Sequence, residues 1–124
     1  MRNKILLVED SKIVQQMYRS KLTIEQFTVQ TADNGMEAIK LLSQEIPDVI
    51  LLDLMMPGID GFKLCRLLRE DPKFTHTPII IVTALSDNDS RIVAFGAGAN
   101  DYLTKPYHPR ELVSKIRDFI DTIE

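Results

Sequence analysis

Residues 49–52, Val-Ile-Leu-Leu, form an unbroken apolar run that leads directly into Asp53. Residues 79–82, Ile-Ile-Ile-Val, form a second such run, which leads into Thr83. Apolar runs of this length beside turn residues predict strands that are covered on both faces, as in parallel sheets. In open α/β sheets, the ligand crevice lies at the carboxyl ends of the strands. The two runs therefore predict a buried parallel sheet with Asp53 and Thr83 at its functional edge.

Short apolar runs alternate with segments of helical period along the whole chain. The pattern predicts strands at residues 4–8, 28–32, 49–53, 79–82 and 101–103. It predicts helices around residues 14–22, 34–45, 64–68 and 87–97, and a last helix that begins near residue 109. Five β-α units in strict alternation predict a doubly wound parallel sheet with helices on both faces. We expect the flavodoxin-like strand order 2-1-3-4-5 and a single domain over residues 1–124.

Local signals refine this prediction. The first helix is expected to start at a cap formed by Asp10 or Ser11 and to bury one apolar face. That face comprises Val14, Met17, Tyr18 and Leu22. Asn34 and Glu37 have the spacing of a capping box for the second helix, which is expected to run to about residue 45. Polar alternation in residues 28–32 predicts a strand at or near an edge of the sheet.

Composition narrows the class of protein. The 124 residues are 44% hydrophobic and 27% charged, with a net charge of -3, as is typical of a globular protein without a nucleic-acid-binding surface. The single cysteine, Cys65, excludes an internal disulfide and fits a reducing compartment. No apolar stretch is long enough to span a membrane, and the first residues lack the pattern of a signal peptide. We therefore expect a cytoplasmic protein.

Polar residues gather at the predicted carboxyl ends of the strands. They are Glu9, Asp10, Asp53, Thr83 and, just after the last strand, Lys105. Neighbouring carboxylates repel one another unless a cation lies between them, and oxygen ligands suit Mg²⁺. An ionised Asp beside such a metal can form an aspartyl-phosphate, with the hydroxyl and the ammonium stabilising the phosphoryl oxygens. Each residue alone also has an ordinary role as a cap, a turn residue or a surface charge. Their joint occurrence favours a site.

The sequence resembles the receiver domain of bacterial two-component response regulators over nearly its whole length. The resemblance lies in residues 5–11 (Ile-Leu-Leu-Val-Glu-Asp-Ser), 50–58 (Ile-Leu-Leu-Asp-Leu-Met-Met-Pro-Gly), 60–61 (Asp-Gly), 82–84 (Val-Thr-Ala) and 98–106 (Gly-Ala-Asn-Asp-Tyr-Leu-Thr-Lys-Pro). It implies a signalling switch that assists its own phosphorylation and dephosphorylation, without being an enzyme that acts on a separate substrate. It also implies a sensor histidine kinase or phosphotransfer protein as phosphodonor.

The resemblance assigns a role to each matching position. Asp53 is the implied phosphoacceptor, and Thr83 and Lys105 contact the phosphoryl group. The implied cofactor is Mg²⁺, with Mn²⁺ as an alternative. Its implied protein ligands are Asp10, Asp53, Glu9 through water, and the backbone carbonyl of Met55. The peptide bond between Lys105 and Pro106 is expected to be cis.

Signal output is implied to pass through a conformational switch. When Thr83 moves toward the phosphoryl group, Tyr102 is expected to turn inward, although a tyrosine that simply packs its ring is an alternative. The implied output face comprises residues 87–97, residues 101–103 and the last helix. This face is expected to contact an effector protein or an output domain. The resemblance also implies a monomer or a phosphorylation-dependent dimer. On that face, Phe95 is an expected contact with a partner or a second copy of the chain, and partial burial of its ring is the alternative. Tyr107 stands where the family more often has Phe, and it is expected to add a hydroxyl at the surface.

Two apolar positions predict a long-lived phosphoryl group. Met55 lies two residues after Asp53, and Leu85 lies two residues after Thr83. Neither side chain can orient an attacking water molecule, so we expect slow self-dephosphorylation.

Other functions remain as alternatives. A phosphatase of the haloacid-dehalogenase type also pairs an Asp nucleophile with Mg²⁺, but that family has a second Asp where this chain has Met55. A nucleotide-binding domain would need a phosphate-binding loop, and G-x-x-x-x-G-K-[ST] is absent from the sequence. A binding module that acts without phosphorylation is the third alternative.

Overall fold

The computed structural model describes residues 3–56 and 58–123; Pro57, which belongs to the second motif quoted above, lies outside them. The strands are β1 (Lys4–Val8), β2 (Thr28–Ala32), β3 (Val49–Leu52), β4 (Ile79–Thr83) and β5 (Asp101–Thr104). The helices are α1 (Lys12–Ile24), α2 (Gly35–Leu42), α3 (Gly61–Glu70), the short 3₁₀ helix η1 (Pro72–Phe74), α4 (Asn88–Gly96) and α5 (Pro109–Ile123). The strands pair in parallel in the order β2-β1-β3-β4-β5. The predicted flavodoxin-like fold is thus confirmed, with β2 at an edge.

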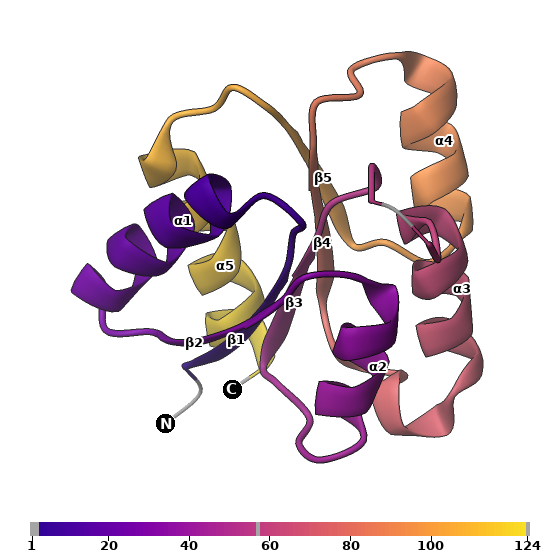
Figure 1. Ribbon diagram of the computed structural model, residues 1–124, viewed down its shortest axis with the longest axis horizontal. Coiled ribbons are helices and arrows are strands. Elements are labelled where there is room, and N and C mark those ends of the chain that lie inside the picture. The colour runs from indigo at the N-terminus through magenta and orange to yellow at the C-terminus, as the bar shows by residue number, and fades with distance from the viewer. Residues whose placement is uncertain (1–2, 57, 124) are drawn as a thin grey trace.

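The sheet separates two hydrophobic cores, because successive strand residues point to opposite faces. In β3, Ile50 and Leu52 pack into the core beneath α2, α3 and α4, whereas Val49 and Leu51 pack beneath α1 and α5. Figure 1 shows these two helical layers on either side of the sheet. Both faces of each central strand are therefore buried, which explains the unbroken apolar runs. Cys65 is buried in the first of these cores.

Two helix starts follow their predicted caps. Ser11, one of the two candidates, accepts a hydrogen bond from the Val14 amide and begins α1. The Asn34 side chain accepts a hydrogen bond from the Glu37 amide at 2.8 Å and begins α2. The Glu37 carboxylate reaches back to the amide of Asp33 at 2.9 Å, one residue before the position expected in a capping box.

The structure corrects two details of the helix prediction. Helix α2 ends at Leu42 rather than near residue 45, and the Ser43 hydroxyl donates a hydrogen bond to the Lys40 carbonyl. Such a local bond competes with continued helix. In α1, Met17 is 59% exposed and does not belong to the buried face. Gln15 is buried there instead, because its amide finds hydrogen-bond partners in the neighbouring turns.

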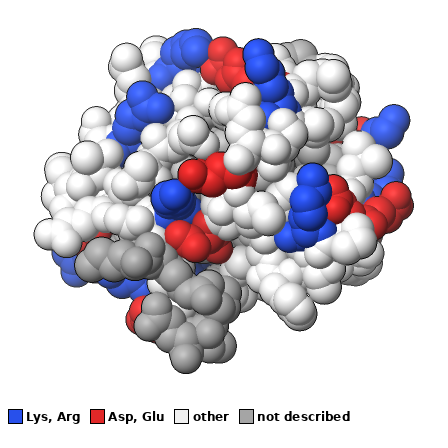
Figure 2. All heavy atoms as spheres, turned by 90° about the horizontal axis from the view of Figure 1, so that it is seen from below, with Lys and Arg blue, Asp and Glu red and all other residues white. Residues whose placement is uncertain are grey.

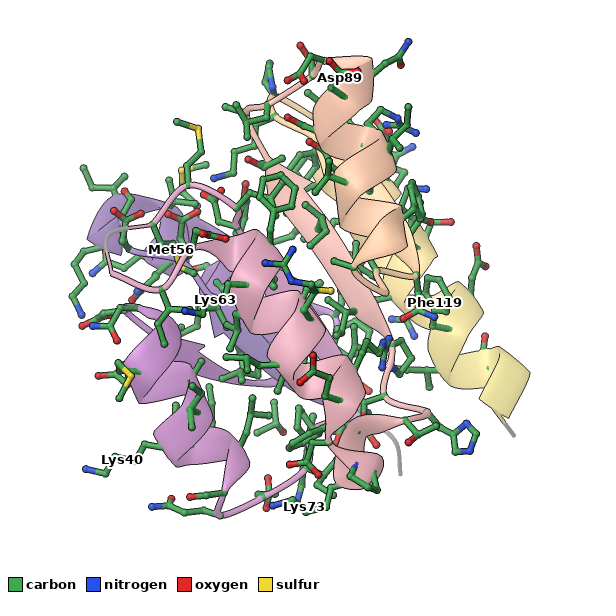
Figure 3. All side chains as sticks on the ribbon, turned by 90° about the vertical axis from the view of Figure 1, so that its right-hand side faces the viewer. Lys40, Met56, Lys63, Lys73, Asp89 and Phe119 are labelled. Atoms are coloured by element: carbon green, nitrogen blue, oxygen red, sulfur yellow. The ribbon has the colours of Figure 1, made fainter. Side chains whose placement is uncertain are left out.

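Among the described residues, the surface away from the carboxyl ends of the strands carries no extended patch of one charge. Figure 2 views this underside and shows basic and acidic side chains in small, interspersed groups among the described residues. Figure 3 shows the layer formed by α2, α3 and α4: Asp89 lies at the top of α4, Met56 lies in the loop after β3, and Lys40 and Lys73 lie at the bottom of the view. No helix in the described part of the chain is long and apolar enough to cross a membrane.

Candidate functional site

The backbone of the sheet fixes Glu9 and Asp53 at the same edge. Beyond the end of β3, the Asp53 amide donates to the Val8 carbonyl at 3.1 Å. Beyond the end of β1, the Glu9 amide donates to the Ala32 carbonyl at 3.0 Å. Both side chains are buried, and Glu9 is only 3% exposed. The hydrogen bonding between the parallel strands therefore continues one residue beyond each strand. It positions two carboxylates that are 44 positions apart in the sequence.

Lys105 joins these two carboxylates. Its ammonium nitrogen lies 2.7 Å from Glu9 Oε1 and 3.0 Å from Asp53 Oδ2. The backbone amide of Lys105 donates to the Thr83 carbonyl at 2.7 Å, which ties the loop after β5 to the end of β4. The Lys105–Pro106 peptide bond is cis. Residues that follow β1 and β3 thus meet at the ammonium of a residue that follows β5, and a backbone bond ties that residue to the end of β4.

The electrostatics of the site reflect burial and this ion pairing. Burial raises the pKa of Glu9, and its hydrogen bonds with Lys105 and the Ser11 amide offset only part of that effect. Burial alone would lower the pKa of Lys105, but its two carboxylate partners outweigh burial and raise it. The ammonium is therefore held in its charged form between two acids.

The carboxylates form a donor set that suits a hard divalent cation. Glu9, Asp10 and Asp53 each offer an oxygen, and these oxygens lie within 4.8 Å of one another. Asp10 is exposed, which leaves one side of the cluster open to solvent. Oxygen ligands with an open side fit Mg²⁺, which retains several water ligands in proteins.

The loop after Asp53 is shaped by close backbone packing. The Met55 amide donates to Asp53 Oδ1 at 3.0 Å, so the backbone of Met55 faces the acceptor carboxylate. The Met55 side chain is 56% exposed. At Gly61, a Cβ atom would lie 2.6 Å from both the Asp53 carbonyl oxygen and the Leu54 Cα. Only glycine allows the start of α3 to pass this close to the loop.

Gln15 supports the turn after β1, which carries Glu9 and Asp10. Sequence patterns do not identify this residue. Its side-chain amide donates to the Glu9 carbonyl and, at 2.8 Å, to Asp33 Oδ1. Asp33 also accepts a hydrogen bond from the Lys12 ammonium at 2.8 Å. A lone Gln on a helix carries no signal in a single sequence, because its role depends on two turns that only the fold brings together.

Thr83 and Tyr102 are linked through the loop after β4. Thr83 is fully buried, and its Oγ1 accepts a hydrogen bond from the Leu85 amide at 3.4 Å. The buried Tyr102 donates its hydroxyl to the Leu85 carbonyl at 2.6 Å. The guanidinium of Arg91, in α4, lies 5.0 Å from the centre of the Tyr102 ring. Tyr102 is therefore turned inward in this structure.

The structure contradicts the expected exposure of the Tyr107 hydroxyl. This oxygen is buried. The Tyr107 ring packs against Tyr18 of α1, with centroids 5.6 Å apart and the planes tilted by 36°. Burial raises the pKa of Tyr107. The ring turns inward because the residues after Lys105 cross over α1 before α5 begins.

Known proteins resemble this chain in sequence. A family model described as "Response regulator receiver domain" matches residues 5–117. "Response regulator PleD" from Caulobacter vibrioides is 41% identical over 117 residues, which are 94% of this chain and 26% of PleD. The chain spans half or less of the length of such curated relatives.

Solved structures resemble it in fold. A putative response regulator from Chloroflexus aurantiacus has a TM-score of 0.92 and 36% identity; the match covers 98% of this chain and 99% of that one. The BeF3-activated N-terminal receiver domain of Klebsiella pneumoniae RstA has a TM-score of 0.89 and 34% identity, with 95% and 98% of the two chains covered.

Proposed function

The chain belongs to the response regulator receiver domain family, and from this premise we propose that Asp53 accepts a phosphoryl group from a phosphohistidine. The donor would be a sensor histidine kinase or a phosphotransfer protein. Receiver domains of this family act in two-component signalling, together with kinases and output domains. We further propose that residues 1–124 form one cytoplasmic signalling domain that acts as a phosphoacceptor rather than as an enzyme on a separate substrate.

The observation that carries this proposal is the shared ammonium of Lys105. The Lys105 ammonium lies 3.0 Å from an oxygen of Asp53, the carboxylate that would attack phosphorus. In phosphoryl transfer, protein groups mainly position the reactants and neutralise the equatorial oxygens. Lys105 stands where it can leave Glu9 and pair with a phosphoryl group on Asp53. Thr83, at the end of the neighbouring strand, supplies a hydroxyl to the same edge.

The reaction requires little from the protein beyond this arrangement. As an oxygen of Asp53 forms a bond to phosphorus, the bond between phosphorus and the imidazole nitrogen of the donor breaks, and the imidazole keeps the electron pair. Mg²⁺, when bound, supplies positive charge that stabilises the phosphoryl oxygens. Asp10, Asp53 and the Met55 carbonyl would hold the ion, with Glu9 acting through water. The Met55 amide keeps the Asp53 carboxylate oriented through its 3.0 Å hydrogen bond.

The output surface in this proposal is the face formed by α4, β5 and α5. Phosphorylation would shift the balance between two conformations of the loop after β4. This loop links Thr83 to Tyr102 and leads into α4. Phe95 of α4 is 43% exposed, which supports a contact with an effector, an output domain or a second copy of the chain.

Labelling with a small phosphodonor tests the proposal. Incubation with Mg²⁺ and acetyl phosphate, followed by intact mass measurement, is expected to add one phosphoryl group per chain. Chelation of divalent ions should prevent the addition, because the carboxylate cluster then repels the incoming phosphate. Peptide mapping should locate the group on the peptide that contains Asp53. Labelling that is independent of divalent ions, or that maps to a different peptide, would contradict the proposal.

The lifetime of the phosphoryl group is a second expected property. Changing both Met55 and Leu85 to Asn is expected to shorten the half-life of the labelled protein by about tenfold or more, because polar groups can orient the attacking water. Met36→Asn is a matched control, since Met36 is an exposed methionine in α2. Decay of the label is followed by intact mass after removal of acetyl phosphate. A half-life that the double substitution leaves unchanged would refute the role of these two side chains.

A further inference from the structure

Gln15, in the first turn of α1, is a polar side chain that is only 5% exposed. Burial of an amide group is unfavourable unless other hydrogen bonds replace those with water. The side-chain amide of Gln15 donates to acceptors in two different turns: the backbone carbonyl of Glu9 and, at 2.8 Å, Oδ1 of Asp33. Glu9 lies in the turn after β1, and Asp33 lies in the turn after β2. Gln15 therefore joins the turn that carries two of the clustered carboxylates to the neighbouring turn at the edge of the sheet.

The backbone of Glu9 is held on both sides. Its amide donates to the Ala32 carbonyl at 3.0 Å, and its Oε2 accepts from the Ser11 amide at 3.0 Å. Its carbonyl accepts from the side chain of Gln15. The carbonyl of Glu9 and the amide of Asp10 belong to one planar peptide unit. The hydrogen bond from Gln15 thus fixes the orientation of the peptide plane from which Asp10 projects.

Asp10 depends on its backbone more than the other two carboxylates of the cluster do. Asp53 is held by the Met55 amide and the Lys105 ammonium, and the same ammonium holds Glu9. Asp10 is exposed, and its carboxylate has no hydrogen bond or ion pair within the described part of the chain. Its oxygen nevertheless lies within 4.8 Å of the oxygens of the other two. The backbone of the turn therefore sets the place of Asp10 in the cluster.

We propose that Gln15 is a positioning residue that sets the affinity of the carboxylate cluster for Mg²⁺ by orienting the peptide unit before Asp10. This inference rests on the proposed function, because it takes Glu9, Asp10 and Asp53 to be the Mg²⁺ site. A ligand that is fixed before the ion arrives needs less ordering at binding. Groups that orient metal ligands contribute to affinity for the same reason. Gln15 contacts neither the ion nor the phosphoryl group, and its bond to Asp33 holds the amide in place.

Gln15→Met tests the inference, because methionine keeps the length of the side chain and removes both hydrogen bonds. Calorimetric titration with MgCl₂ is expected to show an affinity about tenfold below that of the wild type. The Mg²⁺ concentration that gives half the maximal rate of labelling by acetyl phosphate should rise by the same factor. At saturating Mg²⁺, the labelling rate should stay within about twofold of the wild type, since the bound ion then holds Asp10. General loss of structure would lower the maximal rate as well.

Two control variants separate positioning from stability. Gln16→Met is the matched control, because Gln16 is the next residue of α1 and is exposed. It is expected to leave the affinity for Mg²⁺ unchanged. Phe27→Leu weakens the core that lies beyond the other end of α1. It is expected to lower the melting temperature by about 5 °C and to leave the affinity for Mg²⁺ unchanged.

Substitutions of Asp33 test the same contact without altering the core, because this side chain is 38% exposed. Asp33→Asn and Asp33→Ala both remove one negative charge, but only Asn keeps an acceptor for the Gln15 amide. The Ala variant is expected to bind Mg²⁺ about 2- to 5-fold more weakly than the Asn variant. Equal affinities of these two variants would overturn the inference even if Gln15→Met does not fold.

The remaining outcomes distinguish the inference from the proposed function. If the wild type does not bind Mg²⁺, the proposed function fails. If the wild type binds and Gln15→Met binds equally well, the role of Gln15 is overturned while the proposed function stands. Weakening of Mg²⁺ binding by Gln16→Met or Phe27→Leu to the same extent as by Gln15→Met would also overturn it, because the effect would then not depend on the hydrogen bond to Glu9.

Discussion

Asp53→Asn is expected to abolish labelling by acetyl phosphate while the protein stays folded. The amide cannot act as the nucleophile, and no second Asp stands two residues away, where the chain has Met55. The Asn side-chain oxygen can still accept the hydrogen bond from the Met55 amide, which Asp53 Oδ1 now accepts at 3.0 Å. Lys105 keeps its bond to Glu9. Intact mass measurement should therefore show no added phosphoryl group under conditions that label the wild type fully.

Stability measurements separate lost chemistry from lost structure. Asp53→Asn gives up a charge-assisted hydrogen bond and also relieves repulsion among three carboxylates, so its unfolding free energy should change by no more than about 2 kcal/mol. Asp60→Asn is the matched control: Asp60 caps α3 through the Lys63 amide, and Asn caps helices equally well. Normal labelling of Asp60→Asn and none of Asp53→Asn is the expected pair of results. Equal labelling of the two variants would refute the role of Asp53.

Much of the fold could be predicted from the sequence because the sheet imposes a strong pattern. The fully apolar runs at β3 and β4 occur only where both faces of a strand are covered, and their alternation with helical segments leaves few parallel topologies. Details that depend on contacts between elements were not predictable. Met17 has the correct spacing for the buried face of α1, yet it is 59% exposed, whereas the polar Gln15 is buried. The periodicity of a sequence reflects hydrophobicity alone and holds no information about a hydrogen-bond partner in another turn of the fold.

In the candidate site too, some features could be predicted from the sequence and others depend on contacts between elements. The convergence of Glu9, Asp53, Thr83 and Lys105 at one edge follows from parallel strands, so their residue types and order were informative. The sharing of one ammonium by two buried carboxylates was not predictable, because it depends on the path of the loop after β5. The same loop path buries the Tyr107 hydroxyl, for which the sequence predicts a place at the surface.

Lys105→Met is expected to have opposite effects on phosphorylation and on metal binding. Removing the ammonium leaves Glu9 and Asp53 buried without their shared cation, which is expected to lower the unfolding free energy by about 3 kcal/mol in metal-free buffer. The rate of labelling by acetyl phosphate should fall about 100-fold or more, since a charge that stabilises the phosphoryl oxygens is gone. Affinity for Mg²⁺ should rise several-fold, because the carboxylate cluster becomes more negative. Urea unfolding, intact mass kinetics and Mg²⁺ titration measure the three quantities separately.

A double-mutant cycle assigns these effects to the contact between Lys105 and Asp53. If the 3.0 Å pair is energetically coupled, Lys105→Met should destabilise the Asp53→Asn protein less than the wild type, by a difference of about 0.5–3 kcal/mol. Lys63→Met is the control, because Lys63 projects from the exposed side of α3, and it should change the unfolding free energy by less than about 0.5 kcal/mol. Additive effects of the two site substitutions would mean that Lys105 acts through Glu9 alone. Weaker Mg²⁺ binding by Lys105→Met would contradict a site in which the ammonium and the metal ion interact with the same carboxylates.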